Sequence, residues 1–182
     1  MEITKTLYVT DREEWRAWLE EHHATEPDVW LIYYRKDSGK ARIPYNDAVE
    51  EALCFGWIDS TYKDIGDGQF AQRFSPRNPK SAFSPMNKER ARRLIEQGKM
   101  AQAGLDALGH ALEEEFEIPA DILEVLKSDV QVWENFQQFP ESYKRIRVGW
   151  IDGARHRPEE FEKRLRYFVK MTRQGKRYGM VQ

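Results

Sequence analysis

A cluster of basic side chains in residues 73–93 is the feature of this sequence that most directly suggests chemistry. Seven Lys and Arg residues stand there against one acid, Glu89, a local charge of +6 in a chain of net charge −2. Ser84 and Pro85 predict a helix start within the cluster, which would offer free N–H groups and the positive end of the helix dipole. This combination predicts an anion site for a phosphate, a carboxylate or a nucleic-acid backbone. The alternative is a solvated basic face that pairs with acids elsewhere. The basic residues are Arg73, Arg77, Lys80, Lys88, Arg90, Arg92 and Arg93.

Asp59 is a second candidate, because it follows the apolar residues Trp57 and Ile58 and should be partly buried. Such a carboxylate either pairs with an arginine across the predicted hairpin, Arg73 or Arg77, or is held for acid–base chemistry. Trp57 is expected to be a core residue or a pocket wall. No catalytic residue is assigned. The predicted ligand-binding set is Trp57, Asp59, Arg73, Arg77, Lys80, Ser84 and Asn87.

The sequence predicts no metal site and no cofactor. His22 and His23 are adjacent and would point about 100° apart on a helix, while His110 and His156 have no partner at metal-ligand spacing. Cys54 lies in an apolar stretch, which predicts a buried, inert thiol. Neither a glycine-rich phosphate loop nor a nucleophile elbow is present.

The elements that would position these residues alternate between strand and helix in the first hundred residues. Strands are predicted over 7–9 and 29–34, and as the two arms of a hairpin that turns at 66–68. Helices are predicted from Thr10, where Glu13 would complete a capping box, and from Pro44. The predicted fold class is α+β, with a small, mostly antiparallel sheet and helices in the N-terminal half.

The C-terminal half is predicted to be entirely helical. Helices are expected after Ser84, Pro119 and Pro158, with two further apolar sets on either side of Pro140. The acidic stretch 113–117 is a candidate linker, and the tail after Gly175 is expected to fray. These signals predict an α+β domain over 1–112 and a helical subdomain over 113–182. A helical core is expected, with a partner groove as the alternative, from Trp133, Phe136, Phe139, Tyr143 and Trp150.

Composition excludes several classes of protein. With 33% charged residues, 13% aromatic residues and a net charge near zero over 182 residues, the chain is neither disordered, collagen-like nor a coiled coil. The near-neutral total argues against a generally basic nucleic-acid binder but leaves room for a local patch. A single cysteine, the lack of an apolar run long enough to span a membrane and the lack of a visible secretion signal predict a cytoplasmic location without membrane insertion.

Residues 45–60, from Tyr45 to Ser60, resemble the YdeI/OmpD-associated (bacteriocin-protection) family. Residues 72–81, 83–90, 94–100 and 103–105 continue the resemblance. Residues 140–143 and 150–151 and the last predicted helix extend it into the helical half, so that it covers most of the chain. The family tends to have Thr where this chain has Ser75, and Trp where it has Phe83. The resemblance implies a link to resistance against antimicrobial peptides and to outer-membrane partners, but it brings no catalytic residues. It also places six of the predicted site residues within the family pattern, namely Trp57, Asp59, Arg73, Arg77, Ser84 and Asn87.

Taken together, the residues and the resemblance predict a cytoplasmic binding or stress-protection protein without evident catalytic chemistry. Its partner would be a small anionic ligand, held in the predicted pocket, or another protein. One alternative is a nucleic-acid-binding protein that uses the basic segment 73–93. The other is an enzyme that uses Asp59 as a general acid or base.

Overall fold

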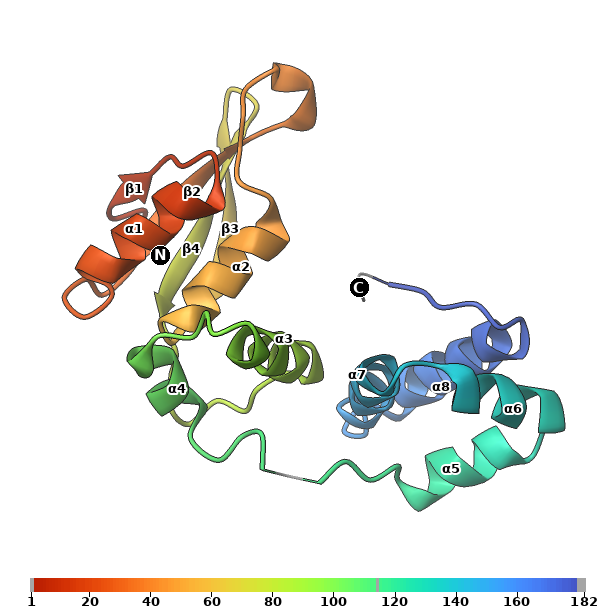
Figure 1. Ribbon diagram of the computed structural model, residues 1–182. Coiled ribbons are helices and arrows are strands. Elements are labelled where there is room, and N and C mark those ends of the chain that lie inside the picture. Colours follow the sequence, from red (N-terminus) through yellow and green to blue (C-terminus); the bar gives the residue numbers. More distant parts are fainter. Residues whose placement is uncertain (1, 114, 180–182) are drawn as a thin grey trace. The chain divides into compact units, whose positions relative to one another are not determined.

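The computed structural model describes residues 2–113 and 115–179, which form two compact units (Figure 1). The first, here called the sheet unit, comprises the residues up to Ala82 together with Arg90–Leu112. The second, the helical unit, comprises Phe83–Glu89 and the residues from Glu113 onward. Helix α3 (Pro85–Glu96) therefore contributes its beginning to the helical unit and its remainder to the sheet unit.

A four-stranded sheet with the strand order β1-β2-β4-β3 forms the centre of the sheet unit. Only the short β1 pairs in parallel, with β2, so the predicted mostly antiparallel sheet is confirmed. The hairpin turn lies at Asp67 and Gly68, whose φ angles of 50° and 69° suit the right-handed twist of the two strands. The strands are β1 (Thr6–Leu7), β2 (Val29–Tyr34), β3 (Trp57–Gly66) and β4 (Gln69–Pro76).

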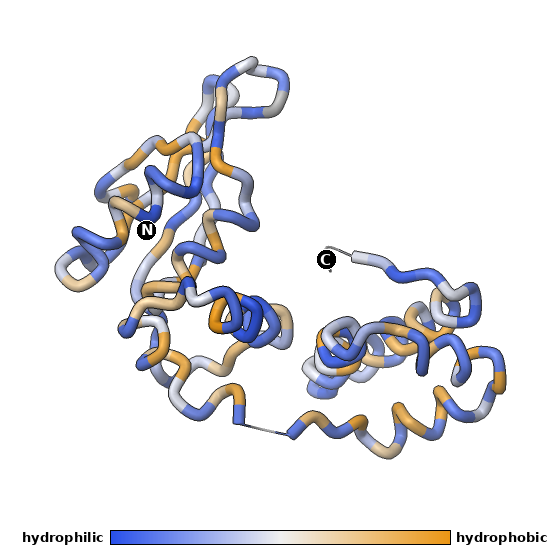
Figure 2. The backbone as a smooth tube through the Cα atoms, viewed as in Figure 1, coloured by the Kyte–Doolittle hydropathy of each residue, from blue (hydrophilic) through white to orange (hydrophobic). Residues whose placement is uncertain are grey.

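Helices α1 (Arg12–His22) and α2 (Tyr45–Cys54) pack on one face of this sheet and bury its core. Trp15 of α1 is fully buried, donates from its indole N–H to the Ala48 carbonyl oxygen at 3.0 Å, and meets the ring of Phe74. In Figure 2 apolar residues follow the strands and recur along α2, as a buried sheet face requires. A short 3₁₀ turn (Lys36–Ser38) connects β2 toward α2.

The start of α1 lies slightly further along the chain than the sequence predicted. Asp11 caps the helix, because its carboxylate accepts from the backbone N–H of Glu14 at 2.9 Å. Glu14 in turn accepts from the N–H of Thr10 at 2.7 Å. The cap is therefore Asp11 rather than Thr10, and the returning bond from Glu14 goes to the N–H of Thr10, one residue before the cap.

The helical unit contains four helices after the acidic stretch, and its described residues from 115 to 179 include no strand. Apolar and polar positions alternate along α5 and α6 in Figure 2, as expected for amphipathic helices. Phe136, Tyr143 and Phe168 are almost fully buried at the centre of the core, which confirms the helical core over these aromatics. The helices are α5 (Ala120–Lys127), α6 (Val130–Gln138), α7 (Glu141–Asp152) and α8 (Pro158–Arg173).

The segment after Gly175 does not fray as predicted, as far as Gly179, the last described residue. The backbone N–H of Tyr178 donates to the hydroxyl of Tyr143 at 3.2 Å. The guanidinium of Arg147 lies 4.4 Å from the centre of the Tyr178 ring. A cation–π contact and burial of the ring hold the segment against the core, although its composition suggested a loose end. Among the described residues, no helix combines the length and the apolar character that crossing a membrane requires.

Candidate functional site

Arg73 has a partner that the sequence did not predict. Its Nε and Nη2 donate to Oδ2 of Asp28 at 3.0 and 2.7 Å, and Asp28 also accepts from the hydroxyl of Thr4. Burial would raise the pKa of Asp28, but the hydrogen bonds from Thr4 and Arg73 outweigh it and lower that pKa. The predicted pairing of Arg73 with Asp59 is wrong, because the strand register places Asp59 opposite Phe74 and so turns Arg73 to the other face.

Asp59 instead accepts hydrogen bonds through one oxygen from two neighbours. The Tyr45 hydroxyl donates to Oδ2 at 2.7 Å, and Nε2 of Gln72 approaches the same atom at 3.4 Å. Burial and the hydrogen bond to Asp59 raise the pKa of Tyr45 to about 12. Asp59 is therefore held in place by a tyrosine and an amide rather than by an arginine of the hairpin.

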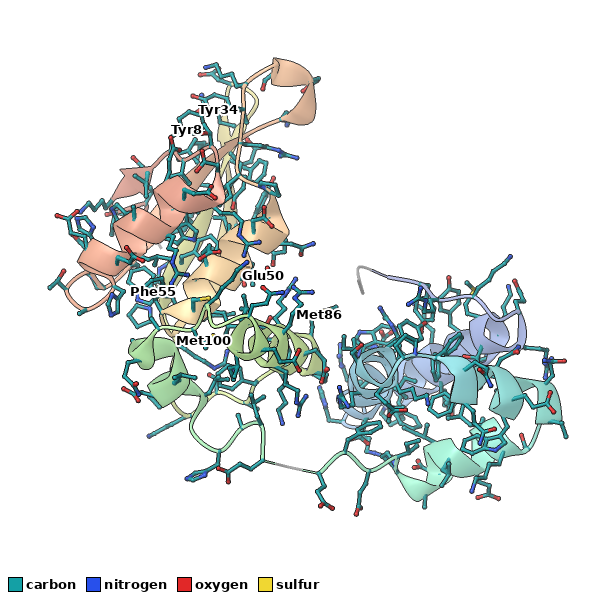
Figure 3. The ribbon with its side chains drawn as sticks, in the orientation of Figure 1. Tyr8, Tyr34, Glu50, Phe55, Met86 and Met100 are labelled. Atoms are coloured by element: carbon teal, nitrogen blue, oxygen red, sulfur yellow. The ribbon has the colours of Figure 1, made fainter. Side chains whose placement is uncertain are left out.

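Other basic side chains of the segment 73–93 also have partners within the sheet unit. Arg77 donates to the carbonyl oxygens of Ser81 and Ala82 in its own loop, and burial lowers its pKa. Arg90 donates to Asn46 at 2.8 Å, and Arg93 pairs with Glu50. Figure 3 labels Glu50 on α2. These bonds favour a paired basic face over an open anion pocket.

The remaining predicted site residues divide between the two units. Trp57 is buried and donates to the His23 carbonyl oxygen at 3.1 Å, as expected of a core residue, while Lys80 lies exposed in the loop before α3. Ser84 and Asn87 belong to the helical unit, where the Ser84 hydroxyl accepts from the N–H of Asn87 at 3.2 Å and caps α3 as predicted. The predicted set of seven therefore stays a prediction as a binding site.

One open groove lies within the helical unit. Its volume is about 580 Å³, and its lining combines apolar and polar side chains from the acidic stretch, α5, α6 and α7. It is lined by Phe116, Glu117, Ile118, Leu123, Trp133, Phe136, Gln137, Glu141 and Lys144.

The floor of the groove is aromatic and its one cation is already neutralised. The rings of Trp133 and Phe136 stack with their centres 5.7 Å apart. The ammonium of Lys144 lies 5.4 Å from the centre of the Phe136 ring and donates to Glu141 at 2.8 Å and to the Gln137 carbonyl oxygen at 3.1 Å. Lys144 is buried, so this pairing leaves the groove without an accessible positive charge.

The groove lies in the most acidic part of the chain. Residues 113–141 contain nine Asp and Glu residues and one lysine. Arg155 and Arg173 pair with two of these acids, Asp121 and Asp129. Four others have no ion-pair partner among the residues that the structure describes, and all four are exposed: Glu115, Glu117, Glu124 and Glu134.

Sequence reasoning found the groove only in part. It identified Trp133 and Phe136, and it kept a partner groove as an alternative to a helical core. It missed Phe116 and Ile118, because the acidic residues around them suggested a linker. The signal that could have found them is their spacing: two apolar residues lie two apart, whereas linkers consist mainly of polar residues. Both side chains pack against the helical core.

Matches to known protein families divide the chain near residue 112, where the continuous part of the sheet unit ends. Residues 7–107 match the family described as "Domain of unknown function (DUF8412)". Residues 115–175 match the family described as "Bacteriocin-protection, YdeI or OmpD-Associated". The resemblance drawn from the sequence is thus confirmed for the helical part, whereas the residues 45–90 that carried most of it fall within the other family.

No curated protein and no solved structure gives a significant match to this chain. The groove lies wholly within the second of the two matched segments, and Asp59 and Arg73 lie within the first. The chain belongs to the DUF8412 family, whose match spans more than half of its length, and its residues 115–175 are similar to the family described as bacteriocin-protection, YdeI or OmpD-associated.

Proposed function

We propose that the protein is a binding protein without catalytic chemistry, and that the groove of its helical unit holds a basic, amphipathic peptide segment. The observation that carries this proposal is the groove itself, whose volume of about 580 Å³ falls within the range of roughly 300–1,000 Å³ typical of ligand sites.

The lining favours apolar side chains on the ligand. Phe116, Ile118 and Leu123 line the groove together with the stacked rings of Trp133 and Phe136. Burying one leucine-sized side chain in such a groove contributes about 1.5–3 kcal/mol, so two or three of them would suffice for a measurable affinity. An amphipathic segment presents apolar side chains at this kind of spacing along one face.

The surrounding charge favours a basic ligand. The exposed carboxylates of Glu115, Glu117, Glu124 and Glu134 lie in the segments that form the groove or in the helices next to it. Lysines and arginines on the polar face of a bound peptide would meet them, which speeds association and disfavours acidic competitors. The description of the family that residues 115–175 match, bacteriocin protection, agrees with a peptide or protein ligand of this kind.

A labelled synthetic amphipathic peptide, with leucines on one face and lysines on the other, tests the proposal. Its binding is followed by fluorescence anisotropy. We expect binding that weakens as salt is added, because the carboxylates attract the peptide through solvent. Trp133→Ala should weaken binding at least about tenfold, since it removes a central aromatic contact. Val130→Ala is the matched control, because Val130 is on the same helix, 74% exposed and outside the groove.

Two results would overturn the proposal. One is equal binding of a peptide in which every lysine is replaced by glutamate, since charge would then contribute nothing. The other is equal binding by the Trp133→Ala and Val130→Ala variants, since the groove would then not be the site.

Anion binding by residues 73–93, which includes nucleic-acid binding, stays a second and less supported proposal. Its support is the local charge of +6, and its weakness is that Arg73 and Arg77 already have protein partners. Inorganic phosphate that raises the Tm of the wild type but not of the Arg73→Ala, Arg77→Ala double variant would support it. Three further statements are likewise proposals. They are that Asp59 acts in an acid–base reaction, that the protein has a part in stress protection, and that it is located in the cytoplasm.

A further inference from the structure

A carboxylate and an exposed tyrosine lie on the same face of the sheet at its edge strand, β3. The register pairs Asp59 with Phe74 and Tyr62 with Gln72, so that two intervening residues of β3 lie opposite one residue of β4. This irregularity turns Asp59 and Tyr62 to the same side, although residues three apart in a regular strand face opposite sides. Bulges that redirect side chains in this way are common beside functional sites.

The Tyr62 ring is the outermost of three neighbouring aromatic rings that lie on strands β2, β4 and β3. The rings of Tyr33 and Phe70 stack with their centres 5.0 Å apart and their planes 2° apart, and the Tyr62 ring lies 5.0 Å from Phe70 on its other side. Tyr33 is 2% exposed and Tyr62 is 56% exposed. The outermost ring is therefore a firm, open aromatic platform rather than a loose surface side chain.

The carboxylate of Asp59 is held in place through one of its two oxygens. Oδ2 of Asp59 accepts from Tyr45 and Gln72, and Gln72 also donates to the Ser60 carbonyl oxygen at 3.2 Å, at the irregular part of the strand. No residue that the structure describes donates to Oδ1 of Asp59. An oriented carboxylate oxygen is a strong acceptor for a hydroxyl donor.

The charge of the site favours a neutral ligand over a cation. Arg90 lies close enough to Asp59 and Tyr45 to interact with both electrostatically, and it donates to Asn46, the neighbour of Tyr45. The positive charge of Arg90 offsets the negative charge of Asp59. A ligand ammonium group would meet Arg90 as well as the carboxylate, whereas a hydroxyl group gains the hydrogen bond without that repulsion.

We propose that Asp59, Tyr62 and Tyr45 form a binding site for a neutral saccharide on this face of the sheet. The apolar C–H face of a sugar ring would lie on Tyr62, and one hydroxyl would donate to Oδ1 of Asp59. The Tyr45 hydroxyl, which holds the other oxygen, is a positioning group. This site lies in the sheet unit and is independent of the peptide groove of the helical unit.

Titration of the full chain with maltose, cellobiose and N,N′-diacetylchitobiose, each to about 50 mM and followed by amide NMR shifts, tests this site. We expect at least one of the three to shift the amides of residues 59–63 with a Kd in the millimolar range. Tyr62→Ala and Asp59→Ala should each weaken that binding at least tenfold, whereas Tyr62→Phe should keep it within twofold.

Controls separate loss of binding from loss of structure. Tyr45→Phe removes the hydrogen bond that holds Asp59 but leaves the carboxylate. It should therefore weaken sugar binding less than Asp59→Ala does, while the two variants lose similar amounts of the free energy of unfolding. Choline serves as the cationic probe. Absence of any shift with the three sugars, unchanged binding in Tyr62→Ala, or binding of choline in their place would each overturn the proposal.

Discussion

Arg73 and Asp28 form a half-buried ion pair in which two guanidinium N–H groups donate to one carboxylate oxygen. The pair ties strand β4 to the residue just before β2, on the opposite face of the sheet from Asp59. Its consequence is that Arg73, the first residue of the basic segment, stabilises the sheet and is not available for an anion without loss of that contact. The basic character of the segment thus has a structural use.

The Asp28 pair predicts an acid-dependent stability. Because the folded-state pKa of Asp28 is lowered, its contribution is fully present above the unfolded value of about 3.9 and is lost as the pH falls through the folded value. Asp28→Asn should cost about 1–3 kcal/mol in the free energy of unfolding at pH 7, and the difference from wild type should shrink below about pH 4. Urea denaturation at several pH values measures both. Asp37→Asn, an exposed control, should change stability by less than about 0.5 kcal/mol; an Asp28 effect that does not change with pH would contradict the assignment.

Glu51 is the centre of a second network. Glu51 is 3% exposed, and its carboxylate accepts hydrogen bonds from Arg12 at 2.8 Å and from Arg16 at 2.9 Å. Glu51→Gln leaves both guanidinium groups without their nearest counter-charge, so it should cost about 2–4 kcal/mol by chemical denaturation. Glu20→Gln breaks an exposed pair with the same Arg16 and should cost at most about 0.5 kcal/mol. Similar losses in the two variants would show that burial of Glu51 does not matter.

Local signals predicted much of the fold. Ser84 caps α3, the hairpin turns at Asp67 and Gly68, and Pro158 begins α8, because each of these features depends on residues close together in the sequence. The α+β class with a helical C-terminal half followed from the same signals.

The candidate sites were predictable only in part, because they depend on strand register and on contacts between distant residues. A one-residue difference in register decides whether Arg73 meets Asp59 or Asp28, and no local pattern in the sequence sets it. Phe116 was hidden among acids and Tyr178 in a tail of low apolar content. Both are held by the helical core, whose shape arises only when the four helices assemble.

Cys54 should be unreactive in the folded protein. Burial, with a further contribution from the nearby Glu51 carboxylate, raises the pKa of its thiol to about 11, so almost no thiolate exists at pH 8. Labelling with a disulfide reagent at pH 8 should be at least about 100-fold slower in the native protein than in urea. Fast native labelling at a rate close to that of a free thiol would contradict this burial.

Gly104 sits where helix α4 (Gln102–Leu108) approaches the end of α2 too closely for a side chain. A Cβ there would lie 2.7 Å from the carbonyl carbon of Cys54 and 2.8 Å from the methyl group of Met100. Figure 3 shows Met100 and Phe55 at this end of the sheet unit. Gly104→Ala should therefore destabilise by about 1–3 kcal/mol, although alanine favours helices. Gln102→Ala, exposed on the same helix, should stay within about 0.5 kcal/mol in the same thermal or urea melts; a stabilised Gly104→Ala variant would show that α4 has room to move.

We expect the groove of the helical unit, lined by residues from Phe116 to Lys144, to bind a basic amphipathic peptide. Amide NMR shifts of the full chain during titration with the unlabelled leucine–lysine peptide test it most directly, because they locate the peptide as well as detect it. The prediction is that the largest shifts fall on residues 115–144, around Trp133 and Phe136, and that in Trp133→Ala they require at least about tenfold more peptide. Shifts confined to the sheet unit, or no shifts at peptide concentrations of about 1 mM, would contradict it.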